Sequence, residues 1–404
     1  MPKRRSGTAK PAGKPQAPVE RRDGGLRGFL AAAAIFGASR LVMFMGVAFS
    51  LNYVKPNPAP GLWNVGTLWW RYLLRFDSAY YLDIAQQGYN YDGNPMHMQS
   101  IVFFPGYPVL ARAVAMILGV SVPFGSILVS NLCTFAAILL LYDLIRRMWD
   151  KTIALTTVAV LSLFPTSLFL SAGYSEGTAL LLTVAVFWFL SRDRLALAVV
   201  CAGLVAGTRP VGFVAAIPLI YEVWLRTGKR ISWQFTVRAV GVAVTATSGL
   251  LTFMMYCWVR FHDPLVFVHA RAAWREAGGL PGGVAAFRQL GTGILHPELL
   301  SEPNFNDGWF FLLFLGVTVL LWRRFPMALN LYSAASFLVL ITTRVLGEPG
   351  FISMNRYLLL LFPSMAGVAL LIQRRVWLIA AMAGVLGALL VMYSAMFAQW
   401  LWAG

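Results

Sequence analysis

The chain has 404 residues, of which 58% are apolar and only 12% charged, whereas an ordinary soluble domain carries about 25% charged residues. The net charge of +17 is spread in short Lys/Arg clusters between long apolar runs, as the positive-inside rule expects of cytoplasmic loops. This composition predicts an integral, multi-pass membrane protein and excludes a nucleic-acid binder.

Two regions follow from the composition. Residues 1–27 are rich in Lys, Arg, Pro and Gly and lack an apolar stretch, which is typical of a disordered tail. Because an apolar run follows at once, we expect a cytoplasmic tail and an uncleaved first span, not a signal peptide. Residues 28–404 are expected to form one all-α transmembrane domain.

Nine apolar runs approach the length needed to cross a hydrocarbon layer of roughly 30 Å. Residues 195–225 add two shorter arms that meet at Arg209, which predicts a helical hairpin with its tip near the outer surface. The nine runs are 28–51, 124–145, 152–170, 174–190, 239–259, 309–322, 326–343, 357–372 and 376–400.

The topology depends on residues 101–120. If this stretch lies in the interface or re-enters, 21 of the 33 Lys and Arg residues fall in the tail and cytoplasmic loops; if it crosses, the later basic loops invert. A crossing also places Arg112 near mid-membrane, at a cost of about 3 kcal/mol. We therefore predict about eleven crossings, an outer C-terminus, and long outer loops at about 52–123 and 260–307.

The first outer loop carries two acids on a predicted interfacial helix. Tyr80, Tyr81, Ile84 and neighbouring residues have helical apolar spacing, which suits a helix lying along the membrane surface. Asp77 at its start is either a helix cap or a functional carboxylate. Asp83 is either a solvated surface acid or a second polar group of the site.

Three further charged residues lie at the ends of predicted spans on the same side. Glu176 is either a first-turn acid of its helix or a carboxylate facing a cavity. Arg209 at the hairpin tip needs an anion, from the protein or from a ligand phosphate. Arg356 either snorkels to the interface or joins the same cavity. Arg40, inside the first span, must find a partner within the bundle.

The four histidines, His97, His262, His269 and His296, all fall in predicted outer loops. His262 and His269 have a spacing that permits one helical face, but no third ligand is evident. The sequence therefore predicts no metal site and no bound cofactor.

Several ordered motifs resemble the PIG-V family, whose eukaryotic members are GPI mannosyltransferases that add the second mannose. They are residues 75–89 (RFDSAYYLDIAQQGY), 103–108 (FFPGYP), 171–176 (SAGYSE), 207–212 (GTRPVG) and 353–357 (SMNRY). The resemblance implies a GT-C glycosyltransferase: a polytopic helical bundle, a polyprenyl-phosphate sugar donor, an inverting mechanism, and an active site facing away from the cytoplasm.

Two departures bear on the acceptor. The family commonly has Trp where this chain has Phe76, and eukaryotic members have Arg-Ser-Asn-Gly where this chain has residues 209–212. The chain also contains no N-glycosylation sequon. We therefore expect a bacterial member in the plasma membrane, with a glycolipid or glycan acceptor in place of a GPI precursor.

These motifs lead to a hypothesis for the site. Asp77 matches the family's aspartate and is expected to be the catalytic base, with Arg209 and Arg356 binding the donor phosphate. Glu176, Ser175, Tyr174 and Asp83 are expected to contact the acceptor or sugar, or to orient Arg209. Phe103, Phe104 and Tyr107 are expected to line a groove for the prenyl chain.

Two other functions fit a membrane protein of this composition. A transporter or flippase of lipid-linked substrates predicts ionisable residues at mid-membrane and two related halves, but the polar set lies on one side and no internal repeat is evident. A non-catalytic scaffold subunit predicts that Asp77 tolerates neutralisation.

Overall fold

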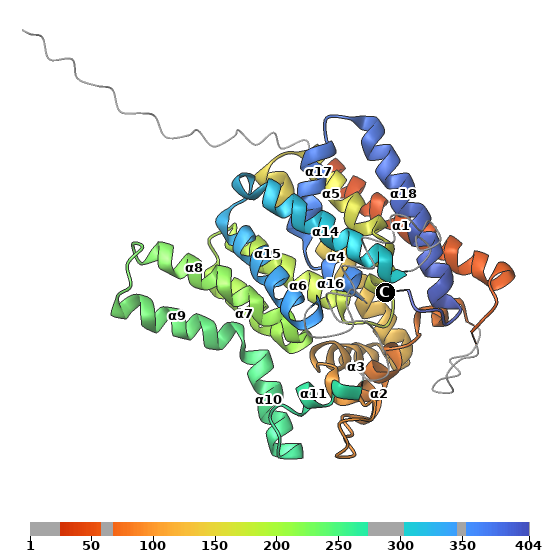
Figure 1. Ribbon diagram of the computed structural model, residues 1–404, viewed down its shortest axis with the longest axis horizontal. Coiled ribbons are helices and arrows are strands. Elements are labelled where there is room, and N and C mark those ends of the chain that lie inside the picture. Colours follow the sequence, from red (N-terminus) through yellow and green to blue (C-terminus); the bar gives the residue numbers. More distant parts are fainter. Residues whose placement is uncertain (1–24, 58–67, 274–302, 346–352, 404) are drawn as a thin grey trace, which may run out of the picture.

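The computed structural model describes residues 25–57, 68–273, 303–345 and 353–403. Within these residues the chain is helical and contains no strand, which confirms the all-α class (Figure 1). The expected tail lies outside the described residues, apart from its last three positions, which begin the first helix.

The longer helices of the first half follow the predicted runs. They are α1 (Gly25–Tyr53), α2 (Ser78–Gln87), α3 (Gly106–Leu118), α4 (Val122–Met148), α5 (Lys151–Leu163), α6 (Glu176–Leu190), α7 (Leu195–Thr208) and α8 (Ala216–Arg226). Short 3-10 segments are η2 (Trp69–Leu73), η3 (Ser100–Val102), η4 (Pro165–Leu170) and η5 (Pro210–Ala215).

The second half continues the pattern. Its helices are α9 (Trp233–Ala246), α10 (Ser248–Phe261), α11 (Val266–His269), α14 (Pro303–Leu320), α15 (Met327–Leu340), α16 (Met354–Leu358), α17 (Phe362–Ile372) and α18 (Val376–Ala398). A 3-10 turn η7 (Trp322–Arg324) and a π-helical turn η8 (Ile341–Val345) complete the described part.

Three described helices, α1, α4 and α18, are each long and apolar enough to cross a membrane. The predicted span 239–259 is instead the pair α9 and α10, bent by 60° at a break. The Ser248–Gly249 pair beside the break is a usual cause of such a bend. Most other apolar helices have 10–17 residues, so the number of eleven crossings stays a prediction.

Prolines explain where several predicted runs divide. Pro165, Pro210 and Pro363 lie at the first or second position of η4, η5 and α17, where the missing N–H costs no helical hydrogen bond. Pro210 follows Arg209, whose backbone is extended, as expected of a residue before proline. The break therefore presents Arg209 between two helical segments.

Helix α3 occupies the stretch on which the topology depends. It has 13 residues and is therefore about 20 Å long, too short to cross the hydrocarbon layer. Its Met116, Ile117 and Leu118 are exposed, while Tyr107 and Ala111 are buried. A short helix with one apolar face uncovered fits the predicted interfacial or re-entrant position.

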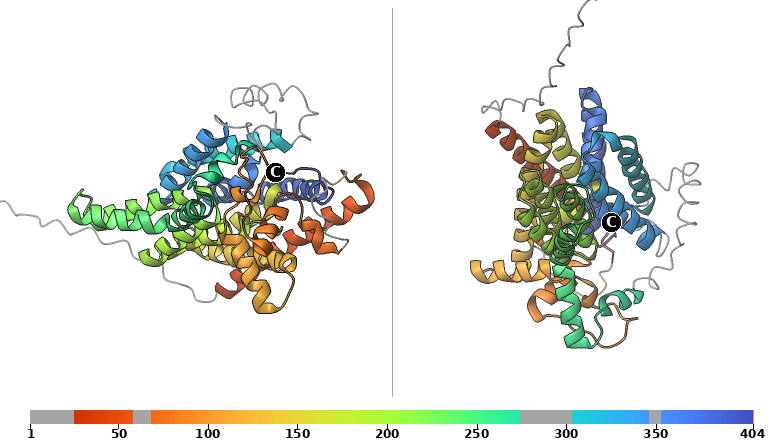
Figure 2. Two further views of the ribbon diagram at one scale, coloured as in Figure 1. Left: turned by 90° about the horizontal axis from the view of Figure 1, so that it is seen from below. Right: turned by 90° about the vertical axis from the view of Figure 1, so that its left-hand side faces the viewer.

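The core is centred on α4, which packs on α6, α5, α1 and α3, while α18 runs along α1 and α7 along α6 (Figures 1 and 2). Two glycines allow the close approaches that form the site. A Cβ on Gly177 would lie 2.5 Å from Thr134 Oγ1 of α4, and one on Gly106 would lie 2.6 Å from Thr208 Oγ1. The second approach brings the first loop against the turn that carries Arg209.

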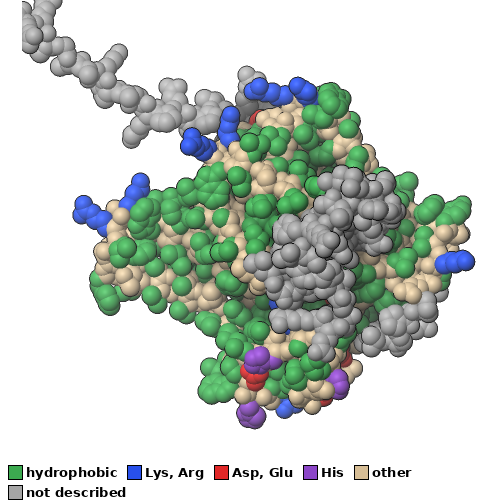
Figure 3. All heavy atoms as spheres, viewed as in Figure 1, with side chains coloured by type: hydrophobic (Ala, Val, Ile, Leu, Met, Phe, Trp, Pro, Cys, Tyr) green, Lys and Arg blue, Asp and Glu red, His purple; other side chains and the backbone are tan. Residues whose placement is uncertain are grey.

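Charged side chains are distributed unevenly over the surface. On the face shown in Figure 3, most visible Lys and Arg side chains lie along the upper and left edges, over the ends of α17, α18, α8 and α9. Visible Asp, Glu and His side chains concentrate at the lower edge, where Figure 1 places α2, α10 and α11. This segregation fits a membrane protein with a basic cytoplasmic side.

Candidate active site

Asp77 lies at the N-cap position of α2, but its side chain makes no capping hydrogen bond. Its Oδ2 instead accepts a hydrogen bond from Arg356 Nη1 at 2.9 Å, and the side chain is 18% exposed. The ion pair, not helix capping, is the contact the structure shows. The carboxylate is therefore paired but keeps partial exposure.

The turn before Asp77 is strained. Phe76 has a φ of 51°, a left-handed conformation that is rare for a bulky residue and costs roughly 1–3 kcal/mol. Its ring packs on Phe397, Trp400 and Trp402, with centroids 5.6, 5.3 and 5.0 Å away. Aromatic residues in the last turn of α18 and just after it therefore hold the backbone that orients Asp77.

Glu176 is the first residue of α6 and is fully buried. Its Oε1 accepts hydrogen bonds from Arg356 Nε at 3.0 Å and Nη2 at 2.9 Å. Arg209 Nη1 lies 2.7 Å from the same oxygen as an ion-pair contact. A buried carboxylate that two guanidinium groups share is an interior charge centre, not a solvated first-turn acid.

These contacts join Asp77, Glu176, Arg209 and Arg356 into what we call the site cluster. Four segments far apart in the sequence supply it: the start of α2, the start of α6, the α7–η5 turn and α16. Arg356 bridges Asp77 and Glu176, with its guanidinium carbon 4.7 Å from the Phe169 ring centroid. Two carboxylates and two guanidinium groups balance, so the four formal charges sum to zero.

Tyr174 and Ser175 support the cluster from beneath. Tyr174 Oη donates to the Arg75 carbonyl at 3.0 Å and accepts from Asp77 N–H at 3.2 Å. Ser175 Oγ lies 2.9 Å from Tyr81 Oη. Both residues are fully buried, so they position the two acids and do not face an open cavity.

Asp83, the other acid of the first loop, is not part of the site cluster. It is half-buried on α2, and its side chain forms no ion pair or hydrogen bond within the described residues. Burial raises the pKa of its carboxyl group above the usual value. The arrangement favours a surface acid over a group that contacts the reacting atoms.

The three aromatic residues expected to line a lipid groove are mostly internal. Phe104 packs on Phe253 and Phe267, with centroids 4.8 and 5.3 Å away, and Tyr107 donates to the Ser126 carbonyl at 2.9 Å. Both are fully buried, and only Phe103 keeps partial exposure. Their contacts fix the first loop against α10, α11 and α4.

Sequence reasoning missed Asp307, which is fully buried near the start of α14. Its carboxylate lies toward the backbone N–H groups of Ser353, Met354 and Asn355, although neither oxygen reaches strict hydrogen-bond geometry in the described part. Asp307 therefore faces the first turn of the helix that carries Arg356. The sequence signal that could have found Asp307 is an acid at the start of an apolar run, the same signal that singled out Glu176.

Arg40 finds its partners within the bundle, as expected. Its guanidinium donates to the carbonyls of Ser162 at 2.7 Å and Ser167 at 2.9 Å, and to Ser171 Oγ at 2.9 Å. These contacts tie α1 to the α5–η4 turn. Arg40 is thus a structural residue just below the site.

Two of the three described histidines, His97 and His269, each pair with one acid. His97 Nδ1 lies 2.6 Å from Asp92, whose pKa is lowered chiefly by that hydrogen bond, and His269 Nδ1 lies 2.7 Å from Asp263. The described residues contain no group of three His, Cys, Asp or Glu side chains that could hold a metal ion. His296 lies outside them.

Two solved structures have a similar course of the chain. One is an oligosaccharyltransferase from Archaeoglobus fulgidus, at 16% identity and a TM-score of 0.47, covering 95% of this chain and 56% of that one. Another is ArnT from Cupriavidus metallidurans, at 14% identity and a TM-score of 0.46, covering 87% and 60%.

Curated relatives are similar over shorter stretches. GPI mannosyltransferase 2 of Candida albicans is 32% identical over 116 residues, 28% of this chain and 27% of that protein. GPI alpha-1,6-mannosyltransferase 2 of Rattus norvegicus is 28% identical over 165 residues, 37% of this chain and 31% of that protein. The matched stretches thus span about a third of each relative.

The family described as Mannosyltransferase (PIG-V) matches residues 51–257, just over half of the chain. The matched part contains Asp77, Glu176 and Arg209, three of the four members of the site cluster. With the helical architecture and the ordered motifs, this match shows that the chain is an integral membrane protein belonging to the PIG-V mannosyltransferase family.

Proposed function

We propose that this chain is a membrane glycosyltransferase that moves a sugar, mannose by its family, from a polyprenyl-phosphate donor to a hydroxyl group of a glycolipid or glycan acceptor. The supporting observation is Arg356, which links the partly exposed carboxylate of Asp77 to the buried carboxylate of Glu176. A base and the cations that a phosphate leaving group needs therefore lie within one side-chain length of each other.

The reaction is a single displacement at the anomeric carbon. The acceptor oxygen attacks that carbon, and Asp77 takes the proton of the acceptor hydroxyl. The bond between the anomeric carbon and the phosphate oxygen breaks, and its electron pair leaves with polyprenyl phosphate. A β-linked donor thus gives an α-glycoside, with one carboxylate acting as the base does in inverting glycosidases.

Arg209 and Arg356 are proposed to stabilise the negative charge that develops on the phosphate. Guanidinium groups present paired N–H donors that match phosphate oxygens. Both are nearly buried, and charge stabilisation is stronger where water is excluded. Because arginine supplies this positive charge, the proposal requires no metal ion, and activity is expected to survive treatment with a chelator.

Glu176 is proposed to orient the two arginines. A direct contact with the sugar is disfavoured because Glu176 has no exposed surface and cannot reach a sugar without rearrangement. Sharing one oxygen between Arg209 and Arg356 keeps the two guanidinium groups side by side. The phosphate would then meet a preformed pair of donors.

The site is proposed to face away from the cytoplasm. It lies at the start of α6, whereas Arg192 follows the end of α6, and Arg146 and Arg147 lie at the end of α4. Basic residues collect on the cytoplasmic side of membrane proteins. The end of the bundle opposite these arginines is therefore the outer end, which is also the side where lipid-linked sugars would be used by a bacterial member.

The direct test uses the purified chain, a polyprenyl-phosphate mannose donor and a lipid extract from its host, with products identified by mass spectrometry. Asp77→Asn is expected to lower transfer by about 10²–10⁴-fold, the range for loss of a general base, with donor binding and expression nearly unchanged. Full activity of this variant would contradict the assignment of the base. If the chain supports its function in the host but transfers no sugar in the purified assay, a scaffold role is favoured.

A further inference from the structure

Aromatic rings as well as acids surround Arg356. Its guanidinium carbon lies 4.7 Å from the ring centroid of Phe169, 4.9 Å from that of Tyr174 and 5.5 Å from that of Trp402. A cation within about 6 Å of a ring centroid is attracted by the aromatic face. Phe169 and Tyr174 are fully buried, whereas Trp402 is partly exposed. Of these three rings, Trp402 is therefore the one that a reactant can reach.

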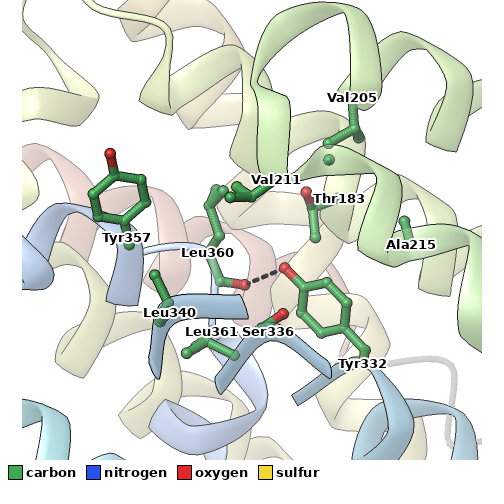
Figure 4. A pocket seen from close by; sticks show the side chains of 11 residues that line it. Thr183, Val205, Val211, Ala215, Tyr332, Ser336, Leu340, Tyr357, Leu360 and Leu361 are labelled. Atoms are coloured by element: carbon green, nitrogen blue, oxygen red, sulfur yellow. Dashed lines mark hydrogen bonds between the residues drawn. The ribbon is translucent and has the colours of Figure 1, made fainter. Parts of the chain in front are cut away.

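The site cluster is closed on the side of Arg209. The Arg209 guanidinium carbon lies 5.1 Å from the ring centroid of Tyr357, which borders the hollow shown in Figure 4. This hollow has a cavity volume of about 20 Å³, which is room for about one water molecule. A phosphate group therefore cannot pass through it. The approach to Arg356 lies instead on the side of Asp77 and Trp402, which both keep partial exposure.

Trp402 lies in a short segment that turns back at the end of α18. The Leu401 N–H donates to the Met396 carbonyl at 2.9 Å, and the Trp400 N–H donates to the Phe397 carbonyl at 3.2 Å. These two bonds form a Schellman ending, in which glycine usually occupies the left-handed position. Here that position is Trp400, with a φ of 62°. An aromatic residue is strained in this conformation, so its surroundings must hold it there.

The two strained aromatic residues of this region, Phe76 and Trp400, pack on each other with centroids 5.3 Å apart. Trp402 contacts the same Phe76 ring at 5.0 Å. Phe76 directly precedes Asp77, and Trp402 contacts Arg356. The contact between Phe76 and Trp402 thus links the two partners of the Asp77–Arg356 ion pair by a second route. Strain that persists in this way is typical of functional sites.

Hydrogen bonds from two other segments fix the turn after α18. Gln399 Nε2 donates to Ser50 Oγ of α1 at 3.1 Å, and the Asn57 N–H donates to the Gln399 carbonyl at 2.9 Å. Arg75 Nε, from the first loop, donates to the Ala398 carbonyl at 3.2 Å. Rings that served only packing would not require a strained turn with anchors on two other segments.

We propose that Trp402 is a positioning residue of the transfer reaction. Its ring holds the Arg356 guanidinium toward Asp77 and forms the wall past which the donor phosphate reaches that arginine. The proposal rests on the proposed function, because it takes Arg356 as a phosphate-binding residue. It extends the site from the family-matched residues 51–257 to the segment after α18.

A matched pair of variants on one helix and its end tests the proposal. Trp402→Leu removes the ring but keeps an apolar side chain, and Trp377→Leu makes the same exchange near the start of α18, where the indole is 63% exposed. The probe is farnesyl phosphate, and its affinity for the full chain in lipid nanodiscs is measured by thermophoresis. Trp402→Leu is expected to weaken binding about tenfold, equivalent to 1.4 kcal/mol, which is within the range of cation–π contacts. Trp377→Leu should stay within about twofold of wild type, and equal affinities of the two variants would overturn the proposal.

A double-mutant cycle separates positioning from packing. If Trp402 acts through Arg356, Trp402→Leu should change the affinity by less than about twofold once Arg356→Gln has removed the guanidinium. Trp402→Phe keeps an aromatic face and should restore affinity to within about threefold of wild type. The thermal midpoint of each variant is measured beside its affinity. A tenfold loss that persists in the Arg356→Gln background, or that Trp402→Phe does not restore, contradicts the proposal.

The binding and transfer assays can fail separately. A chain whose affinity for the probe depends on Trp402 but which transfers no sugar contradicts the proposed activity alone. A chain that transfers sugar, but whose Trp402→Leu variant equals wild type in kcat, KM and affinity, contradicts only the role of Trp402.

Discussion

Helix α6 carries a cluster of charged side chains at each end, and the two differ in how they are assembled. At its start lies the site cluster. At its end Asp143 of α4 binds Arg146 at 2.9 Å and Arg147 at 3.1 Å, and also pairs with Arg192. We call these four residues the Asp143 cluster. The ends of α6 are about 22 Å apart.

The Asp143 cluster is largely local, and its three arginines are partly exposed although Asp143 itself is buried. Arg146 and Arg147 lie three and four residues after Asp143 on the same helix, and the side chains of Arg146, Arg147 and Arg192 are 24, 45 and 25% exposed. Trp188 Nε1 donates to Asp143 at 3.1 Å, and Arg192 stacks on the Trp188 ring. This arrangement links α4 to α6. Water can solvate an arginine of the cluster that loses its partner.

Three members of the site cluster lack this exposure to water. Arg209 and Arg356 are under 10% exposed and Glu176 not at all. Buried ion pairs seldom stabilise a protein more than apolar side chains of similar size. The Asp143 cluster shows that two helices can be linked by charges that stay partly exposed. The buried charges of the site cluster therefore point to a use other than stability.

Glu176→Gln is expected to have the largest effect on folding. It leaves two buried guanidinium groups with one carboxylate, and breaking a buried ion pair from one side costs about 3–5 kcal/mol. The free energy of unfolding, measured by denaturant titration in detergent, checks the loss. A loss below about 1 kcal/mol would mean that the cluster is hydrated and resembles the Asp143 cluster.

Arg356→Lys separates the bridging geometry from the charge. Lysine keeps the positive charge but cannot offer the planar set of donors that reaches both Asp77 and Glu176. We expect kcat to fall by about 10²–10³-fold, the range for loss of one charge-stabilising donor. A variant with wild-type kcat and only a raised KM for the donor would assign Arg356 to ground-state binding alone.

Asp143→Asn should cost much less than Glu176→Gln. Asp143 itself is buried, but its three arginines are each partly exposed, so solvent screening weakens each pair toward the few tenths of a kcal/mol typical of surface pairs. Asparagine also keeps an acceptor for Trp188. The same unfolding titration is expected to show a loss of about 1 kcal/mol, with transfer activity preserved. A loss as large as that of Glu176→Gln would remove the contrast between the two ends of α6.

The sequence was informative where a single physical rule dominates. Apolar run length predicted the three long helices α1, α4 and α18, because a bilayer imposes that length. The motifs also singled out Asp77, Glu176 and Arg209, which lie at helix ends, and Arg356, which lies in the short helix α16. A charge at such a boundary is conspicuous, and the structure brings these four side chains together.

What the sequence left open depends on contacts between distant segments. Phe104 and Tyr107 look like any aromatic pair near a membrane surface, and only packing on α10, α11 and α4 shows that they are internal. Asp307 looks like a loop acid until α16 is seen beside it. The bend between α9 and α10 lies beside a Ser–Gly pair. The effect of this pair depends on α7, the helix that Gly249 contacts.

Asp83→Asn completes the comparison, because Asp77 and Asp83 are acids of the same helix in different surroundings. Asp83 has no arginine partner among the described residues, so transfer by Asp83→Asn is expected to stay within about twofold of wild type, against the large loss in Asp77→Asn. Burial raises the pKa of Asp83, which makes its charged form less favourable in the folded than in the unfolded chain. Its contribution to stability therefore falls as pH rises through that pKa. At neutral pH the asparagine variant should be as stable as wild type or slightly more so, and the difference should vanish in acid. A large loss of transfer would instead place Asp83 in contact with the acceptor.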